Sequence, residues 1–196
     1  MSRPANLGQA APRTIDRVVP RRYFAAYGAK KTHEKSLKRM DFGGRYLFGA
    51  KRAELWAALN DAALLKAVIP GCEAIVWTGP ATLELVIRVN LGLVHPTFAG
   101  ELTLSDVHPA ERYTLSGRGK GGVLGFAGGT ADISLADAPD GTILSFDAAG
   151  RADGAIMRLG SRLIGNSAQK VIDGFFEAIG REMPANVTPL PRLPRA

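Results

Sequence analysis

A glycine-rich segment, residues 117–129, is the first candidate for chemistry, because it holds seven glycines in thirteen residues. The G-x-G-x-x-G spacing of a dinucleotide-binding turn occurs in its first part, from Gly117 to Gly122. That turn binds pyrophosphate only where a strand leads directly into a helix. Here strand-like runs lie on both sides, and no helical pattern follows. We interpret the glycines as the wall of a binding cavity, since glycine in a strand leaves room for a close-approaching ligand.

Other reactive side chains form no complete catalytic set. Cys72 has no histidine beside it in the sequence, so we interpret it as a small buried residue, with a reactive thiol as the alternative. Asp106 and His108 are a candidate acid/base pair, but they lie where a strand runs into a turn and polar residues are expected. The histidines are far apart and no Cys/His cluster has metal-ligand spacing, so we predict no metal site.

The positive charge of the chain is concentrated at its N-terminus. The formal net charge is +7, but residues 1–39 hold ten Lys and Arg against two acidic residues. The remaining residues are nearly neutral, which argues against a nucleic-acid-binding domain. No apolar run approaches the roughly 20 residues that span a bilayer. We expect a cytoplasmic protein, since its single cysteine cannot form an internal disulfide.

Residues 1–39 show no sustained periodicity and are predicted to be a disordered basic arm. Arg21-Arg22 followed by Tyr23 and Phe24 is similar to a twin-arginine export signal, but the apolar stretch after it is short. A basic arm that contacts anionic lipid at the inner membrane face, or a partner protein, is the alternative. Met40 is a further candidate for the start of the chain.

The pattern behind Met40 predicts one domain, residues 40–183, followed by a Pro/Arg-rich tail, residues 184–196. We expect a strand over 42–48, helices over 51–59 and 62–68, five or six strands in an antiparallel meander, and a long helix over 154–183. Asn60-Asp61 can cap the second helix, and Pro70-Gly71 ends it. The strands alternate apolar and polar residues, which places Tyr113, Leu115 and Gly117 on the inner face. The long helix has one apolar half, and Gln169 and Asp173 fall on its polar half. The predicted fold class is therefore α+β, a curved antiparallel sheet that grips one long helix.

Small residues are expected on both sides of the space between sheet and helix. On the helix they are Gly160, Ser167, Ala168, Gly174 and Ala178, and on the sheet Gly100, Gly117, Gly119, Ala131 and Ala148. Protein interiors are close-packed, so these residues indicate either an internal cavity or a closer approach of the two layers. We favour the cavity.

The order of elements resembles the helix-grip fold of the START and Bet v 1-like superfamily. Shorter motifs narrow the resemblance to the CoxG family of carbon monoxide dehydrogenase subunits: 56–61 (WAALND), 69–73 (IPGCE), 109–113 (PAERY), 117–119 (GRG), 125–127 (GFA) and 159–164 (LGSRLI). The resemblance implies an accessory protein of molybdenum-containing dehydrogenases. It also implies a cavity for a quinone-like molecule and a role in tying the enzyme to the membrane. Many family members carry a hydrophobic C-terminal anchor, which the tail after Met183 lacks.

We therefore expect a non-enzymatic carrier that binds a hydrophobic, quinone- or lipid-like ligand, with no catalytic residue and no intrinsic cofactor. The predicted ligand-binding residues are Trp77, Phe98, Gly117, Gly119, Phe126, Leu159, Leu163, Ser167 and Phe175. One alternative is a cyclase- or hydrolase-like enzyme of the same superfamily, which requires at least two of Cys72, Glu73, Asp106 and His108 to converge on the pocket. Another is an interaction module whose basic arm recruits a dehydrogenase.

Overall fold

The chain forms an eight-stranded antiparallel sheet and three helices within the part that the computed structural model describes, residues 38–88, 95, 97–121, 126–152 and 161–192. For residues 38, 126, 152 and 161–168 only the backbone is described. The elements in chain order are β1 (Lys38–Phe48), α1 (Arg52–Leu59), α2 (Ala62–Val68), β2 (Cys72–Trp77), β3 (Thr82–Arg88), β4 (Thr97–His108), β5 (Arg112–Lys120), β6 (Phe126–Ala138), β7 (Gly141–Ala152), α4 (Ser161–Glu182) and β8 (Val187–Leu190).

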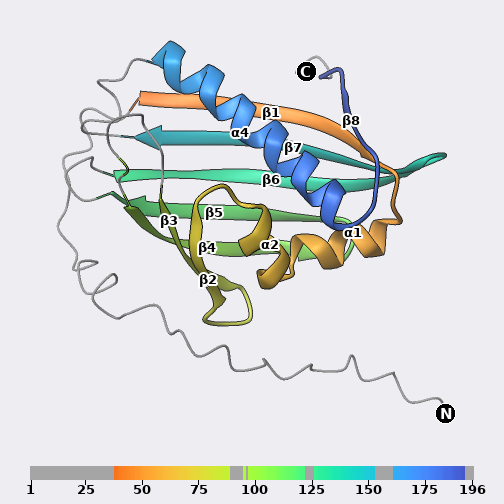
Figure 1. The fold of residues 1–196 in the computed structure, drawn as a ribbon, viewed down its shortest axis with the longest axis horizontal. Coiled ribbons are helices and arrows are strands. Elements are labelled where there is room, and N and C mark those ends of the chain that lie inside the picture. The colour runs from red at the N-terminus through yellow and green to blue at the C-terminus, as the bar shows by residue number, and fades with distance from the viewer. Residues whose placement is uncertain (1–37, 89–94, 96, 122–125, 153–160, 193–196) are drawn as a thin grey trace.

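The strand order in the sheet is β2-β3-β4-β5-β6-β7-β1-β8. The meander from β2 to β7 is therefore completed by the first strand of the chain, which pairs with β7. Helix α4 runs across one face of this sheet, and α1 and α2 lie at one end of the same face (Figure 1). This arrangement confirms the predicted helix-grip architecture.

The two short helices have the signals that the sequence predicts. The Asp61 carboxylate accepts hydrogen bonds from the backbone amides of Ala63 and Leu64, at 2.8 and 3.2 Å, and so caps α2. Gly71 follows α2 with a φ of +72°, and a Cβ there would collide with the carbonyl oxygen of Arg88. Only glycine fits this turn, which leads the chain from α2 into edge strand β2.

The glycine-rich segment extends two strands instead of separating them. Strand β5 continues through Gly117 and Gly119 to Lys120, and β6 begins at Phe126 and passes through Gly128 and Gly129. Residues 122–125 lie outside the described part of the chain. No helix follows β5 directly, as the dinucleotide-binding turn would require.

The first and the last strand of the chain differ from the prediction. Strand β1 begins at Lys38 instead of Phe42, so the last two residues of the predicted arm pair with β7. Strand β8 lies within the predicted tail and pairs with β1, although it contains Pro189. An edge strand tolerates proline because one of its sides needs no backbone donor. The rest of the arm lies outside the described residues, as do the first seven residues of the predicted long helix.

The core lies where the C-terminal half of α4 meets the sheet. Phe176 and Ile179 of α4 are buried there against Tyr46, Phe48 and aromatic or aliphatic side chains of α1, α2, β6 and β7. The rings of Tyr46 and Phe176 lie 4.4 Å apart between centroids. None of the described helices is long and apolar enough to cross a membrane.

A polar contact also joins α4 to β1. The Tyr46 hydroxyl donates a hydrogen bond of 2.5 Å to the Asp173 carboxylate, which also accepts one from the Gln169 side-chain amide at 2.8 Å. Burial, followed by this hydrogen bond, raises the pKa of Tyr46 above its ordinary value. The helical wheel placed Gln169 and Asp173 on the polar half, away from the sheet. The structure instead turns both side chains toward β1.

Two glycines that pair across β6 and β7 differ in the space around them. A Cβ at Gly129 would lie 2.5 Å from the backbone oxygen of Ala149 and 3.0 Å from the Cα of Gly150. At Gly150, the partner of Gly129 in the sheet register, the nearest atom would be 3.7 Å away. The backbones of β6 and β7 therefore approach each other so closely at position 129 that a residue with a Cβ does not fit there.

We expect Gly129→Ala to lower the free energy of unfolding by about 1–3 kcal/mol, because the strand backbones must separate. Gly150→Ala is the matched control. It should be neutral or stabilising by up to about 1 kcal/mol, since alanine restricts the unfolded chain more than glycine does. Urea unfolding of both variants measures the difference. Equal stability of the two variants would contradict the close approach at Gly129.

Candidate functional site

On the inner face of the sheet, the side chains of β5, β6 and β7 become smaller along each strand. From the end near α1 toward the opposite end, the inner residues are Leu135, Ile133, Ala131 and Gly129 in β6, Leu144, Phe146, Ala148 and Gly150 in β7, and Tyr113, Leu115, Gly117 and Gly119 in β5. Because these residues are in register, large side chains form one row across the sheet and glycines form another. Helix α4 is held by the large side chains, so space remains above the small ones.

The first part of this space is an apolar cavity of about 320 Å³ between the sheet and all three described helices. Its walls include Leu59 and Asn60 at the end of α1, Leu65 and Ile69 at α2, Ile172, Phe175 and Phe176 of α4, and inner-face residues from β2 to β7. The volume is at the lower end of the range of small-molecule pockets, about 300–1,000 Å³. We call it the inner chamber.

A second, more open space of about 430 Å³ continues along the same face. It is bordered by Gly100, Gly117, Gly119, Gly129 and Gly150 together with Met40, Leu85, Ile87, Phe98 and Leu102. Leu102 lines both spaces, and its Cδ2 lies over Gly117, 2.7 Å from where a Cβ would be. We call this space the glycine chamber.

The structure brings five of the nine predicted ligand-binding residues to these two chambers. Trp77 and Phe175 line the inner chamber, and Phe98, Gly117 and Gly119 line the glycine chamber. Leu159 and the side chains of Phe126, Leu163 and Ser167 lie outside the described part of the chain. The structure thus favours a cavity over close packing of the layers. Binding at these residues stays a prediction.

The predicted small-residue stripe of the helix is not part of the described lining. A Cβ at Gly174 would meet nothing within 4 Å, and Ala178 packs against the core cluster. Helix α4 lines the inner chamber with Ile172, Phe175 and Phe176 instead. Gly160 and the side chains of Ser167 and Ala168 lie outside the described residues. The described cavity therefore owes its volume to the small residues of the sheet.

The hydrogen-bonding groups of the inner chamber are few. The indole N–H of Trp77 donates to the backbone oxygen of Asn60 at 3.3 Å, and the side-chain amide of Asn60 donates to the backbone oxygen of Trp56 at 2.8 Å. Tyr113 is only 8% exposed, and its ring packs edge-on against Trp56 at 5.4 Å between centroids. Its hydroxyl forms no hydrogen bond within the described part of the chain. Sequence reasoning placed Tyr113 on the inner face but did not include it among the ligand-binding residues.

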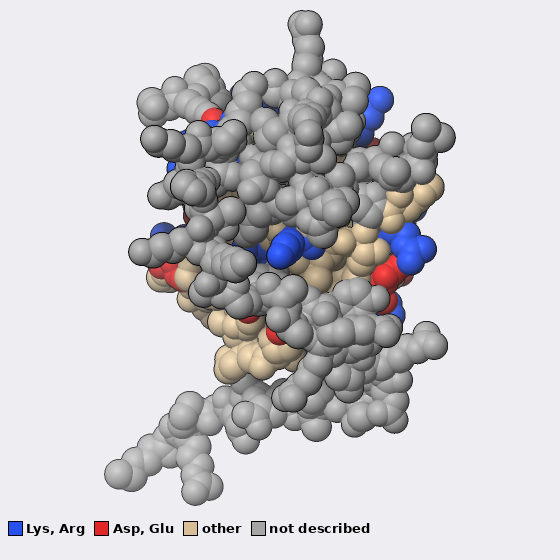
Figure 2. Space-filling view, turned by 90° about the vertical axis from the view of Figure 1, so that its left-hand side faces the viewer, with Lys and Arg blue, Asp and Glu red and all other residues tan. Residues whose placement is uncertain are grey.

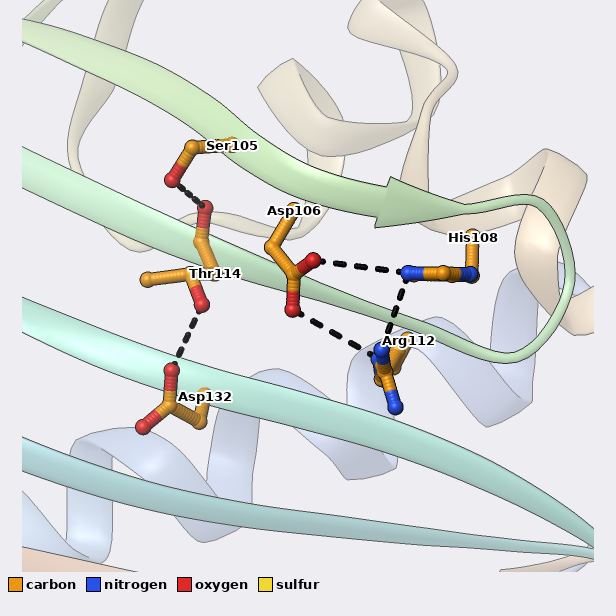
Figure 3. A network of polar contacts seen from close by, with 6 residues as sticks. All are labelled: Ser105, Asp106, His108, Arg112, Thr114 and Asp132. Atoms are coloured by element: carbon orange, nitrogen blue, oxygen red, sulfur yellow. Dashed lines mark hydrogen bonds and ion pairs between the residues drawn. The ribbon is translucent and has the colours of Figure 1, made fainter.

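The candidate acid/base residues lie outside the cavity. Asp106 and His108 are on the face of the sheet turned away from α4, together with Arg112, Thr114 and Asp132 (Figure 3). An oxygen of Asp106 is 3.4 Å from Nε2 of His108, which is 2.9 Å from Nη2 of Arg112. The side chains of Asp106 and His108 are 61% and 49% exposed. They form an exposed network of polar contacts and are not among the residues that line either chamber.

Cys72 and Glu73 do not line the chambers either. The Cys72 thiol is half-buried and 3.5 Å from the backbone oxygen of Ala74. Burial raises the pKa of this thiol, which disfavours the reactive thiolate. Glu73 forms an ion pair with Arg88 at 2.8 Å. The enzyme hypothesis requires at least two of its four candidate side chains to line the pocket, and none of them lines either chamber. Separately, no cluster of metal-ligating side chains occurs among the described residues.

Basic side chains gather at the end of the sheet where the glycine chamber lies. The register places Arg118, Arg151 and Arg39 in one row across β5, β7 and β1, with Lys120 close by. Figure 2 views the molecule from the side that is on the left in Figure 1, and Lys and Arg are visible there among apolar and neutral residues. Arg39 and Arg118 are paired with Asp41 and Glu101, each at 2.9 Å.

Burial in the apolar surroundings raises the pKa of Tyr113 to about 12. The folded state therefore keeps the phenol neutral at a pH where the unfolded chain ionises it. The stabilisation is complete below about pH 10, the ordinary pKa of tyrosine, and is lost as the pH rises through about 12. Between these values the wild type should lose about 2 kcal/mol more stability than Tyr113→Phe. Urea unfolding of both proteins measures the slopes, and equal slopes would contradict a buried phenol.

The fold is shared with solved structures of low sequence identity. A conserved protein from Geobacillus kaustophilus has a TM-score of 0.68 and 23% identity, with 76% of this chain and 99% of that chain covered. The aromatase/cyclase ZhuI from Streptomyces sp. R1128 has a TM-score of 0.54 and 13% identity, with 76% and 94% covered. Ara h 8.0201 has a TM-score of 0.52 and 16% identity, with 76% and 99% covered. These similarities establish the helix-grip fold.

A search of the curated proteins gave no match. A family model, by contrast, matches residues 44–183, which include all of the described sheet except part of β1 and β8. Its description is that of CoxG, a carbon monoxide dehydrogenase subunit. The match covers well over half of the sequence and agrees with the motifs quoted above. The chain belongs to the CoxG family of carbon monoxide dehydrogenase subunits.

Proposed function

We propose that this protein is a non-enzymatic accessory protein that holds a hydrophobic molecule between its sheet and α4. Its ligand is quinone-like or lipid-like, and its partner is a molybdenum-containing dehydrogenase of the carbon monoxide dehydrogenase type. The observation that carries the proposal is the pair of neighbouring apolar chambers that share Leu102 in their walls. The family of the chain supports the accessory role.

Ligand burial supplies the driving force in this proposal. The chamber walls are mostly aliphatic and aromatic side chains and glycine backbone, with Asn60 at the inner chamber and Arg118 and Arg151 at the glycine chamber. Small, mostly apolar cavities of this kind do not hold water well. A hydrophobic molecule that enters gains about 25 cal/mol for each Å² of apolar surface removed from water. It also restores the van der Waals contacts that the side chains around an empty cavity lack.

A cavity enzyme is the other candidate, since one similar structure is an aromatase/cyclase. A shared fold does not establish a shared reaction, and the identity is only 13%. Enzymes of this kind need polar groups that converge on the cavity. Here Asp106, His108 and Glu73 lie elsewhere and are paired with other side chains. The carrier is therefore the function that the described residues support better.

Ligand uptake tests the proposal directly. Gly119→Leu should weaken the uptake of an added long-chain quinone at least about tenfold, because the new side chain fills the glycine chamber. The domain should still fold, since a Cβ at Gly119 would be 3.4 Å or more from its neighbours. Native mass spectrometry and solvent extraction of the purified protein measure the bound molecule.

Thr130→Leu is the matched control for Gly119→Leu. Thr130 is exposed on the outer face of the adjacent strand, β6, so a leucine there leaves both chambers unchanged. It should retain wild-type uptake and the thermal stabilisation that a bound ligand confers. A wild type that takes up no quinone or lipid would refute the carrier function, and equal uptake by both variants would exclude the glycine chamber.

We further propose that the protein makes peripheral contact with the inner face of the cytoplasmic membrane. The basic arm, residues 1–39, and the basic residues beside the glycine chamber support this contact. Anionic lipids attract such residues by about 1 kcal/mol for each Lys or Arg near the surface. The same contact would place the open chamber next to a source of hydrophobic molecules and bring the dehydrogenase to the membrane.

Cosedimentation with lipid vesicles tests the membrane contact. The full chain should bind phosphatidylglycerol vesicles at low salt and dissociate as salt screens the charges, and it should not bind phosphatidylcholine vesicles. Charge reversal of Lys120 and Arg151 to Glu should weaken binding about tenfold or more. Arg181→Glu, in the last turn of α4, is the control and should have little effect. Equal binding to both kinds of vesicle would refute an electrostatic contact.

A further inference from the structure

Three side chains that line the inner chamber can donate a hydrogen bond, and the hydroxyl of Tyr113 is the donor that has no partner within the described part of the protein. The indole N–H of Trp77 and the side-chain amide of Asn60 already donate to backbone oxygens. Tyr113 is buried, lies on the inner face of β5 and lines the chamber. The hydroxyl of a buried tyrosine usually finds a hydrogen-bond partner, so the retention of this hydroxyl in an apolar wall calls for an explanation.

Packing of the ring does not explain the hydroxyl. The edge-on contact with Trp56 involves the aromatic rings, and phenylalanine would make the same contact. The other buried tyrosine, Tyr46, shows the usual solution, since its hydroxyl donates to Asp173 and is approached by the Gln169 amide at 3.4 Å. Tyr113 has the same chemical group in a similar degree of burial, but its hydroxyl has no hydrogen-bond partner among the described residues.

We propose that the Tyr113 hydroxyl donates a hydrogen bond to an oxygen of the bound molecule and so fixes which end of it lies innermost. This inference rests on the carrier function proposed above. The ligand class that fits is a neutral hydrophobic molecule with at least one acceptor oxygen, such as a ketone or quinone carbonyl. A ligand with a carboxylate or phosphate would find no basic side chain among the described lining residues of the inner chamber. The free-energy cost of removing its charge from water would then be uncompensated.

The register of the sheet then gives the orientation of the ligand. Tyr113 lies in the row of large residues with Ile133 and Phe146, whereas Gly117, Gly129 and Gly150 form the row on the far side of Leu115 and Ala131. The oxygen-bearing end of the molecule therefore lies near α1. Its apolar remainder passes Leu102 and continues into the glycine chamber.

Two ring compounds of matched shape test the hydrogen bond. One is a naphthoquinone methylated at both free ring positions, which prevents alkylation of the Cys72 thiol, and the other is the corresponding dimethylnaphthalene without the two oxygens. Isothermal titration of the full chain measures both affinities. Tyr113→Phe should weaken quinone binding about five- to tenfold, the usual effect of losing one hydrogen bond, and should leave or improve hydrocarbon binding.

Tyr46→Phe is the matched control, because it removes a phenolic hydroxyl that does not line either chamber. It should lower stability and leave the ratio of the two affinities at its wild-type value. An equal effect of Tyr113→Phe on both compounds, or no effect, would overturn the proposed hydrogen bond while the carrier function stands. Failure of the wild type to bind either compound would overturn both, and tight binding of naphthoate would contradict the neutral ligand class.

Discussion

The contact between the C-terminal half of α4 and the aromatic end of the sheet sets the distance between the two layers. Phe176 and Ile179 are buried against Tyr46 and Phe48, and the Tyr46–Asp173 hydrogen bond joins the helix to β1 beside them. Side chains of this size hold the helix away from the sheet backbone. Where the inner face changes to alanine and glycine, no described side chain of α4 fills the missing volume, because α4 is already held at the height that the aromatic residues impose. The two chambers follow from this mismatch.

The same constraint explains where glycine is needed and where it only leaves space. At Gly129 the backbones of β6 and β7 approach so closely that a Cβ does not fit, whereas at Gly119 and Gly150 a Cβ would make ordinary contacts. Glycine at position 129 allows β6 and β7 to come together, whereas glycine at positions 119 and 150 widens the glycine chamber. A close-packed core would fill the second kind of position, since buried apolar side chains stabilise the folded state by about 1.5–3 kcal/mol each. Their absence at these two positions leaves room for a bound molecule, as the proposed carrier function requires.

Local patterns were sufficient to predict the faces of the strands, but contacts between distant residues were not. Alternation placed Tyr113, Leu115 and Gly117 on the inner face, and the Asp61 cap and the turn at Gly71 fixed the short helices. The wheel of α4 misassigned Gln169 and Asp173, because their partner Tyr46 is more than 120 residues away in the sequence. Strand β8 was missed because Val187–Leu190 contains a proline and pairs only with β1, at the edge of the sheet. Tyr113 was placed correctly but overlooked, since the lack of a hydrogen-bond partner has no local sequence signal.

The position of polar groups relative to the sheet separates a carrier from an enzyme more clearly than the fold does. Asp106, His108 and Arg112 contact one another on the outer face, and Asp132 accepts a hydrogen bond from Thr114 there, where water screens their charges. The inner chamber has only neutral groups among its described lining residues, and Trp77 and Asn60 are already hydrogen-bonded. General acid–base catalysis needs a base as well as an acid, whereas the described lining residues of the inner chamber offer the Tyr113 phenol, which burial keeps protonated at ordinary pH. The Tyr113 hydroxyl can still discriminate between ligands. A bound molecule with an acceptor oxygen would pair with the hydroxyl, whereas a molecule without one would leave it unpaired.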